Sequence, residues 1–297
     1  MILFSTLTFL LVNIIYIKIW NKFLNKVPTG IGVLLIIPCF FFYLEQNINF
    51  ISITFLIIFS LIYFLDDLIE INFFFRILLQ IFASLVIYFS FITEINLMII
   101  FINLVLFLIL VNTLNFQDGE DLNIATLLFI LFGVFYIYAE SNFIKKTSEL
   151  ILIFLISFSF FNIKKFSLYY GDSGCYFISI IIFLFFYNEI HNTLLIKLLI
   201  ATIIFPIIDV FYVIAHRIFK KQNLLSRNYL HLYQILAQKF NNKLYLLPNI
   251  LFSFLNIFIS LNFSLGINFI IFLFIINIFL LFVIHLIVMK MTDKNAS

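Results

Sequence analysis

The sequence predicts an all-α, polytopic integral membrane protein, with about 11 transmembrane helices and a polar active-site cleft on its cytoplasmic face. Of its 297 residues, 65% are hydrophobic and 10% are charged, whereas a soluble domain carries roughly 25% charged residues. Apolar stretches recur at lengths near the roughly 20 residues that a helix needs to cross a bilayer. These stretches are apolar on every side, which excludes the alternating pattern of a membrane β-barrel.

The helices follow one another between short polar connections. The first, 2–19, has no basic segment ahead of it and no small-residue cleavage site, so we expect a retained helix and not a removed signal peptide. No soluble domain and no strong internal repeat interrupts the chain, and we expect one transmembrane domain over 1–297. The remaining helices are expected at 31–45, 50–66, 75–93, 96–111, 122–139, 148–161, 174–190, 193–215, 246–264 and 267–289.

Counting the connections in alternation separates two sets with different charge. One set carries Lys145 and Lys146, and Lys197 lies inside a helix. Positive charge marks the cytoplasmic side of a membrane protein, so we expect the other set to be cytoplasmic, with the N-terminus outside and the C-terminus inside. That set holds the other basic residues: Lys18, Lys22, Lys26, Arg76, Lys164, Lys165, Arg217, Lys220, Lys221, Arg227, Lys239, Lys243, Lys290 and Lys294.

Acidic and amide residues also gather in the basic set of connections. Asp66 and Asp67 end a helix, where they are either charges in the headgroup zone or a cation or proton site. Asp118 and Asp121 flank Gly119, and Asn112 and Asn115 precede them at helical spacing. Carboxylates and amide carbonyls are ligands for a hard divalent cation, although an acidic loop that caps the next helix is an alternative.

Two further polar stretches lie on the same predicted face. Gly171-Asp172-Ser173-Gly174 opens an apolar helix, whose first N–H groups can receive a phosphate and whose Asp172 can hold a metal; a plain capped turn is the alternative. Pro206 and Asp209 precede Arg217 and a basic loop in which Arg227 and His231, four residues apart, suit one face of a short helix. These basic residues are either cytoplasmic charges or a phosphate-binding set.

Six motifs in this order resemble those of a known enzyme family. They are VPTGIGVLL (27–35), FLDDLIEINFFFRILLQIFAS (64–84), NTLNFQDGEDLNIA (112–125), YYGDSGCYFIS (169–179), PIIDVFYVIAHR (206–217) and YLHLYQIL (229–236). The family is that of the polyprenyl-phosphate N-acetylhexosamine-1-phosphate transferases, within glycosyltransferase family 4, and the resemblance extends from about residue 26 to residue 236. The H-x-Y-Q ending, in place of a run of three histidines, resembles the subgroup that includes O-antigen-initiating enzymes.

The sequence departs from the family pattern at a few positions. Leu122 stands where the third motif has its second glycine, and Cys175 stands where a serine follows the G-D-x-G turn. A basic residue usual before that turn is replaced by Ser167, and Lys164 or Lys165 can substitute for it.

The resemblance implies transfer of an N-acetylated sugar-1-phosphate from a UDP-sugar to undecaprenyl phosphate, with release of UMP. It implies Mg²⁺, or alternatively Mn²⁺, held by Asn115 and Asp172, and catalytic positions at Asp66, Asp67, Asp118 and His231. Whether a carboxylate or the lipid phosphate attacks the donor stays open. The implied substrate-binding residues are Asn112, Asp121, Arg76, Lys165, Arg217 and Arg227.

The resemblance also implies a multi-pass protein of the bacterial inner (plasma) membrane with a cytoplasmic active site. Its partners would be undecaprenyl phosphate, a UDP-N-acetylated sugar and membrane lipid, with no nucleic acid and with a homodimer as one option. Two other classes stay open from the sequence: a secondary transporter or lipid flippase, and an inactive homologue that acts as an assembly partner.

Overall fold

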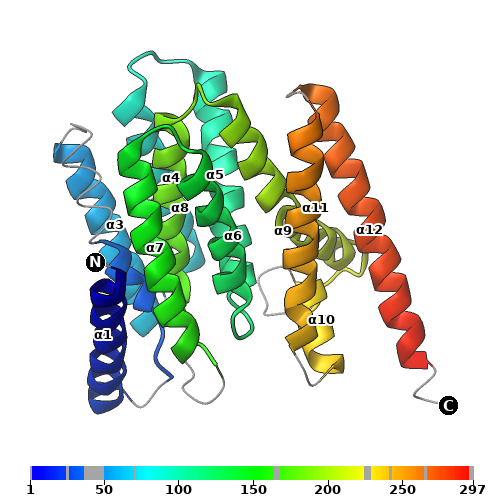
Figure 1. Ribbon diagram of the computed structural model, residues 1–297, viewed down its shortest axis with the longest axis horizontal. Coiled ribbons are helices and arrows are strands. Elements are labelled where there is room, and N and C mark those ends of the chain that lie inside the picture. The colour runs from blue at the N-terminus through cyan, green and yellow to red at the C-terminus, as the bar shows by residue number, and fades with distance from the viewer. Residues whose placement is uncertain are drawn as a thin grey trace. The chain divides into compact units, whose positions relative to one another are not determined.

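Every regular element in the part of the chain that the computed structural model describes is a helix; the described residues are 2–24, 27–36, 50–69, 71–163, 168–223, 229–240, 243–263 and 266–293. It divides into two compact units, Met1–Asn192 and Thr193–Ser297. Six helices in the described residues are long and apolar enough to cross a membrane, which indicates a multi-pass membrane protein (Figure 1). The higher count of about 11 transmembrane helices and the single domain over 1–297 stay predictions.

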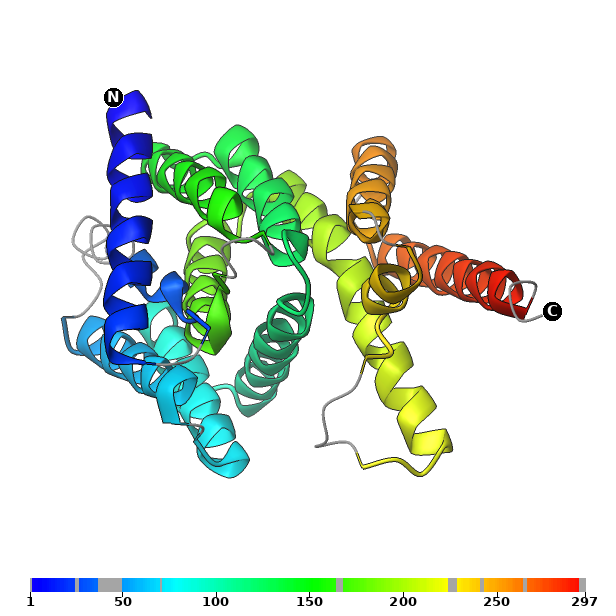
Figure 2. The same ribbon diagram turned by 90° about the horizontal axis from the view of Figure 1, so that it is seen from below.

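The first unit is a bundle around one buried helix. α8 buries nearly every side chain from Gly171 to Phe185 and contacts α3, α4, α5 and η1. Figure 2 shows α8 in the middle of this unit with the other helices around it. The elements are α1 (Ile2–Phe23), η1 (Ile31–Leu35), α3 (Phe50–Ile69), α4 (Phe73–Phe91), α5 (Leu97–Gln117), α6 (Asn123–Tyr138), α7 (Asn142–Phe161) and α8 (Gly171–Asn188).

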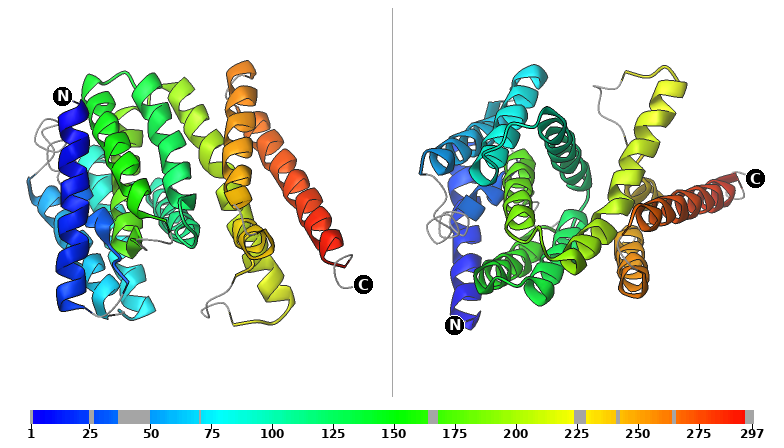
Figure 3. Two further views of the ribbon diagram at one scale, coloured as in Figure 1. Left: turned by 60° about the horizontal axis from the view of Figure 1, so that its bottom comes forward. Right: turned by 90° about the horizontal axis from the view of Figure 1, so that it is seen from above.

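The second unit packs two helices on a third. α11 (Leu247–Asn262) and α12 (Ile267–Asp293) both contact α9 (Thr193–Phe219), which continues through Pro206 (Figure 3). Two shorter elements, α10 (Leu232–Lys239) and η2 (Lys243–Leu246), contact each other. α10 was not among the helices expected from long apolar runs, because it has only 8 residues and its apolar side chains are interrupted by Gln234, Gln238 and Lys239.

Most expected helices are present, and several are longer than expected at polar ends. α5 continues to Gln117, so Asn112 and Asn115 are helical, and α8 begins at Gly171. α7 begins at Asn142 and includes Lys145 and Lys146, which were expected in a connection. Of the expected 31–45 helix, residues 31–35 form a 3₁₀ helix, and 37–49 lie outside the described residues.

Helix caps are supplied locally at some starts and by distant residues at others. Asn72, Asn96 and Ser141 each accept a hydrogen bond from a backbone N–H in the first turn of the helix that follows. The buried carboxylate of Glu189 accepts from the N–H groups of Glu140 and Ser141, at 2.7–3.0 Å. Because Glu189 follows α8, it fixes the start of α7 to the end of α8.

Candidate active site

The N-terminus of α8 is the centre around which the polar motifs of the first unit meet. Asp67, at the end of α3, accepts hydrogen bonds from Asp172 N (2.9 Å) and Ser173 N (3.1 Å). Asp118, directly after α5, accepts from Gly171 N (2.8 Å). The first N–H groups of a helix lack intrahelical partners and carry partial positive charge, so the two carboxylates cap α8 from two other helices.

The backbone of the 27–35 segment lies directly against this helix start. Tyr169 N donates to Pro28 O (2.9 Å), and Gly32 N donates to Tyr170 O (3.3 Å). Gly171 has a φ of +84°, and a Cβ there would lie 2.4 Å from Gly30 N. Glycine is therefore required at residue 171 both for its backbone conformation and for the close approach.

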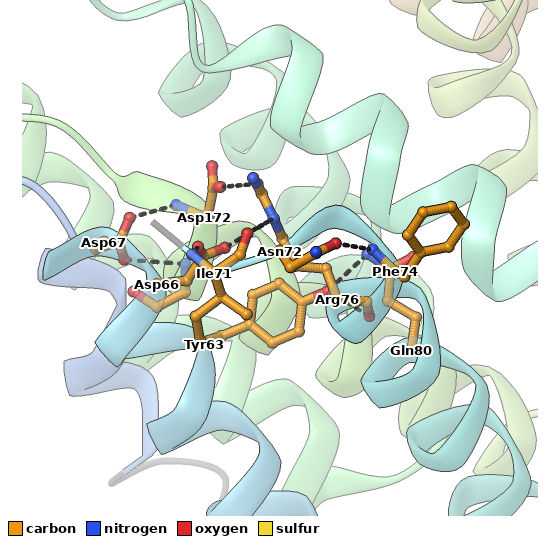
Figure 4. A network of polar contacts seen from close by, with 10 residues as sticks. Tyr63, Asp66, Asp67, Ile71, Asn72, Phe74, Arg76, Gln80 and Asp172 are labelled. Carbon is orange, nitrogen blue, oxygen red and sulfur yellow. Dashed lines mark hydrogen bonds and ion pairs between the residues drawn. The ribbon is translucent and has the colours of Figure 1, made fainter. Parts of the chain in front are cut away.

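Arg76 joins the two acidic motifs of the first unit. Its Nε lies 3.2 Å from Asp66 Oδ2, and its Nη1 lies 3.0 Å from Asp172 Oδ2 (Figure 4). The Asp66 side chain is 3% exposed, whereas that of Asp172 is 30% exposed. One guanidinium thus bridges a buried carboxylate and an accessible one.

A chain of uncharged side chains holds the helices beside Arg76. Gln80 donates to the Tyr63 hydroxyl (2.7 Å), and this hydroxyl donates to the backbone carbonyl of Arg76 (3.1 Å). Asn112 donates to Gln80 Oε1 at 3.5 Å, which is a long contact. The Tyr63 ring stacks on Tyr176 of α8, with centroids 4.0 Å apart. These contacts tie α3, α4, α5 and α8 together next to the acids.

Four carboxylates and one guanidinium share this end of the unit, and we call Asp66, Asp67, Asp118, Asp172, Arg76 and Asn115 the acidic site. The negative charges disfavour one another. Burial raises the pKa of Asp118 to about 8, and the charges of Asp172 and Asp67 add to that rise. Such a site favours an additional cation.

Asn115 and Asp172 fit the binding mode of a magnesium ion that is shared with a substrate. The Asn115 side chain lies within interaction range of the Asp172 carboxylate, and Asp172 is accessible. Among the described residues, no group of three or more His, Cys, Asp or Glu side chains could hold a metal by itself. Mg²⁺ usually keeps several waters and binds one or two carboxylates together with substrate phosphates, so a two-residue site suffices for that mode.

The turn between α5 and α6 contains Leu122, one of the residues that depart from the family pattern. Leu122 has a φ of +63°, a conformation that glycine adopts without strain. Its N–H donates to Asn162 Oδ1 (2.6 Å), and Asn162 Nδ2 donates to Leu168 O (2.6 Å). Asn162 thus connects the turn that carries Asp118 and Asp121 to the segment before α8. Asn162 lies in none of the six motifs, so sequence reasoning missed it.

Gln117 and Asp121 frame the same turn. Gln117 is buried, and its Oε1 accepts from Asn123 Nδ2 (2.9 Å), so it supports the turn even though it matches no fixed family position. Asp121 is half-buried in the turn. Its part in substrate binding stays a prediction.

In the second unit, His231 is oriented by a buried carboxylate. His231 Nδ1 lies 2.9 Å from Asp209 Oδ2, and Leu232 N donates to Asp209 Oδ1 (3.1 Å). His231 N also donates to Gln234 Oε1 (3.3 Å), which completes a capping box at the start of α10. His231 therefore precedes the short helix and does not lie on a face of it, which corrects the sequence expectation.

Of the other three basic residues predicted for substrate binding, the structure describes one. Arg217 is buried near the end of α9 and donates to the backbone carbonyl of Asn223. Lys165 and Arg227 lie outside the described residues.

The hydrogen bonds confirm that four motifs meet at one end of the first unit, as the alternation of the helices predicts. These motifs are 27–35, 64–84, 112–125 and 169–179. The end of α3, the start of α4, the end of α5 and the start of α8 all contribute to the acidic site. These features define a multi-pass membrane protein with a candidate cation-binding and phosphate-binding site at one end of a helical bundle.

Comparison with known families narrows this class. Residues 49–188 match the model of glycosyl transferase family 4. The matched range contains every residue of the acidic site and ends before the second unit begins. A comparison with curated proteins finds no match. The family match supports a transferase similar to glycosyl transferase family 4, with general phosphosugar transfer as its chemistry.

Proposed function

We propose that this protein transfers an N-acetylated sugar-1-phosphate from a UDP-sugar to undecaprenyl phosphate and so initiates synthesis of a cell-surface polysaccharide of the O-antigen kind. One observation carries the proposal: the family match covers the residues whose side chains assemble around the start of α8. The proposal places the protein in the bacterial inner membrane, with this site on the cytoplasmic side. The basic residues in the connections that carry these motifs support that orientation.

The proposed reaction exchanges one phosphoanhydride bond for another. An oxygen of the lipid phosphate attacks the β-phosphorus of the UDP-sugar, and a new P–O bond forms. The bond from the β-phosphorus to the oxygen that bridges to the α-phosphorus breaks, and UMP leaves with the electron pair. The lipid product is undecaprenyl-diphosphate-sugar.

Arg76, Asn115 and Asp172 provide the groups for binding the donor diphosphate. The Arg76 guanidinium is one-third exposed and donates in a fork that suits phosphate oxygens. Asn115 and Asp172 would hold Mg²⁺, and a bound Mg²⁺ neutralises charge that develops on the phosphates. Phosphoryl transfer depends mainly on such positioning and charge stabilisation.

The capping contacts of Asp67 and Asp118 favour direct attack by the lipid phosphate. Both Asp67 oxygens accept backbone hydrogen bonds, and Asp118 accepts one from Gly171. We propose that these two acids position the start of α8. A phosphate monoester loses its second proton near pH 6, so the lipid phosphate is largely ionised at neutral pH and needs no strong base.

The role of the second unit rests on its motifs and on the Asp209–His231 pair. Asp209 fixes the orientation of the His231 ring. We propose that His231, Arg217 and Arg227 contribute to binding of phosphate or of the sugar-phosphate. Removing the imidazole in His231→Ala should then raise the KM for the UDP-sugar.

Membranes that contain the protein test the proposal directly. They are incubated with undecaprenyl phosphate, Mg²⁺ and a panel of radiolabelled UDP-N-acetylated sugars, and the lipid fraction is extracted. We expect one labelled lipid product from wild-type protein and its loss in Asp172→Asn. Glu120→Gln, a charge change in the neighbouring turn, is the matched control and should retain activity.

Two results would contradict the proposal. Folded wild-type protein that yields no lipid-linked product with any sugar would favour the inactive assembly partner. Movement of lipid or solute across the membrane without such a product would favour the transporter or flippase.

A further inference from the structure

The accessible carboxylate of the acidic site is occupied by a side chain of the protein itself. Asp172 Oδ2 pairs with Arg76 Nη1 at 3.0 Å (Figure 4), and the Asn115 side chain lies within interaction range of the same carboxylate. A divalent cation that binds Asp172 and Asn115 must therefore approach a carboxylate that already has a positive partner. The guanidinium and the cation cannot both neutralise this carboxylate without repelling each other.

The two ends of the Arg76 guanidinium are held differently. At the Nε end, Asp66 Oδ2 lies at 3.2 Å and the backbone carbonyl of Ile71 accepts at 3.2 Å. Asp66 is buried and also accepts from Ile71 N (2.5 Å), so this end is anchored. At the Nη1 end, the partner is the partly exposed Asp172. The guanidinium can give up Asp172 while it keeps Asp66.

We propose that Arg76 and the divalent cation compete for Asp172, and that the cation releases Arg76 Nη1 to the diphosphate of the UDP-sugar. The inference rests on the proposed function, because it uses the metal pair Asn115 and Asp172. It assigns Arg76 a second task beyond donor binding: without metal, it keeps the site neutralised and closed to a bare cation. The metal and the nucleotide then favour each other's binding, since each removes an obstacle to the other.

Replacing Arg76 by glutamine separates these two tasks, because its effects on the two ligands have opposite signs. Mn²⁺ binding to the detergent-solubilised protein is measured as the decrease in the EPR signal of the free ion. We expect Arg76→Gln to bind Mn²⁺ about threefold to fivefold more tightly, the size of a partly exposed ion pair. At saturating Mg²⁺, we expect UDP, which has the diphosphate common to all UDP-sugars, to bind about tenfold more weakly by calorimetry.

Matched variants separate competition from a change in overall charge or folding. Lys146→Gln removes one positive charge from the exposed surface of α7, near the opposite end of the unit, and should leave both affinities unchanged. Arg76→Lys keeps the charge and should bind Mn²⁺ nearly as wild type does. If Arg76→Gln fails to fold because Asp66 is left buried and unpaired, the double variant Arg76→Gln/Asp66→Asn removes the pair together and should still tighten Mn²⁺ binding.

Unchanged or weaker Mn²⁺ binding in folded Arg76→Gln overturns the competition, even if the protein is an active transferase. Wild-type Mn²⁺ binding that Asp172→Asn does not weaken overturns both the competition and the proposed metal pair. Tighter Mn²⁺ binding and weaker UDP binding in Arg76→Gln support the competition whether or not a sugar-phosphate acceptor has been found.

Discussion

Replacing Gly171 by alanine tests the contact on which the acidic site depends. A Cβ on Gly171 would lie 2.4 Å from Gly30 N and 2.6 Å from Gly30 Cα, both backbone atoms, and 2.9 Å from Asp67 Oδ1. The φ of +84° adds strain. A left-handed conformation costs a residue with a Cβ roughly 1–2 kcal/mol, and overpacking costs about 1–3 kcal/mol. We therefore expect Gly171→Ala to lose about 2–5 kcal/mol of stability.

The measurement is thermal unfolding of the purified protein in detergent. A change of 1 kcal/mol shifts the midpoint by roughly 2–4 °C in a domain of 150–250 residues, so the expected decrease is about 4–20 °C. Gly133→Ala is the matched control, because a Cβ on Gly133 of α6 would meet nothing within 4 Å. In a helix interior this control should gain about 0.5–1 kcal/mol. A Gly171→Ala protein as stable as wild type would refute the close packing of the 27–35 segment on α8.

Three further predictions concern the caps and the strained turn. Leu122→Gly should be more stable than Leu122→Ala by up to about 1 kcal/mol, because both remove the side chain and only glycine adopts the φ of +63° freely; equal thermal unfolding of the two would contradict this strain. Asp67→Asn should lower the unfolding free energy by about 1–3 kcal/mol, because one of two backbone donors loses its acceptor. Asp172→Asn should lower the unfolding free energy less. Thermal unfolding in detergent ranks the two variants, and the reverse order would argue against the capping role of Asp67. Glu189→Gln should lower stability by about 1–3 kcal/mol, because it weakens the hydrogen bonds that the carboxylate accepts from Glu140 N and Ser141 N at the start of α7. Transfer activity per folded molecule should stay unchanged. A loss of transfer activity at an unchanged unfolding temperature would count against a structural role.

The sequence predicts the architecture of the acidic site well because charge and apolar length determine it. Runs of Phe, Ile and Leu must be helices in lipid, and their alternation brings 66–74, 112–121 and 162–173 to one end. The hydrogen bonds of Asp67 and Asp118 to the start of α8 confirm this arrangement. The metal-binding role that the motifs imply for Asn115 and Asp172 stays a prediction.

What the sequence could not predict depends on contacts between distant backbones. The motifs mark Asp67 and Asp118 as catalytic candidates. In the structure, the carboxylate of each also accepts a hydrogen bond from the start of α8, more than 50 residues away in the sequence. The approach of Gly30 to Gly171 requires tertiary packing that no local pattern encodes. Asn162 joins two connections through hydrogen bonds, and only the folded chain brings its partners together.

The most direct test of the central claim follows the phosphorus atom. A UDP-sugar labelled with ³²P at the β-phosphate is incubated with membranes, Mg²⁺ and undecaprenyl phosphate, and the lipid and water phases are counted. Transfer of a sugar-1-phosphate predicts ³²P in the lipid phase, unlabelled UMP in water, and loss of both in Asp172→Asn. Label that stays in UDP while the sugar enters the lipid phase would instead show simple glycosyl transfer and would contradict the account.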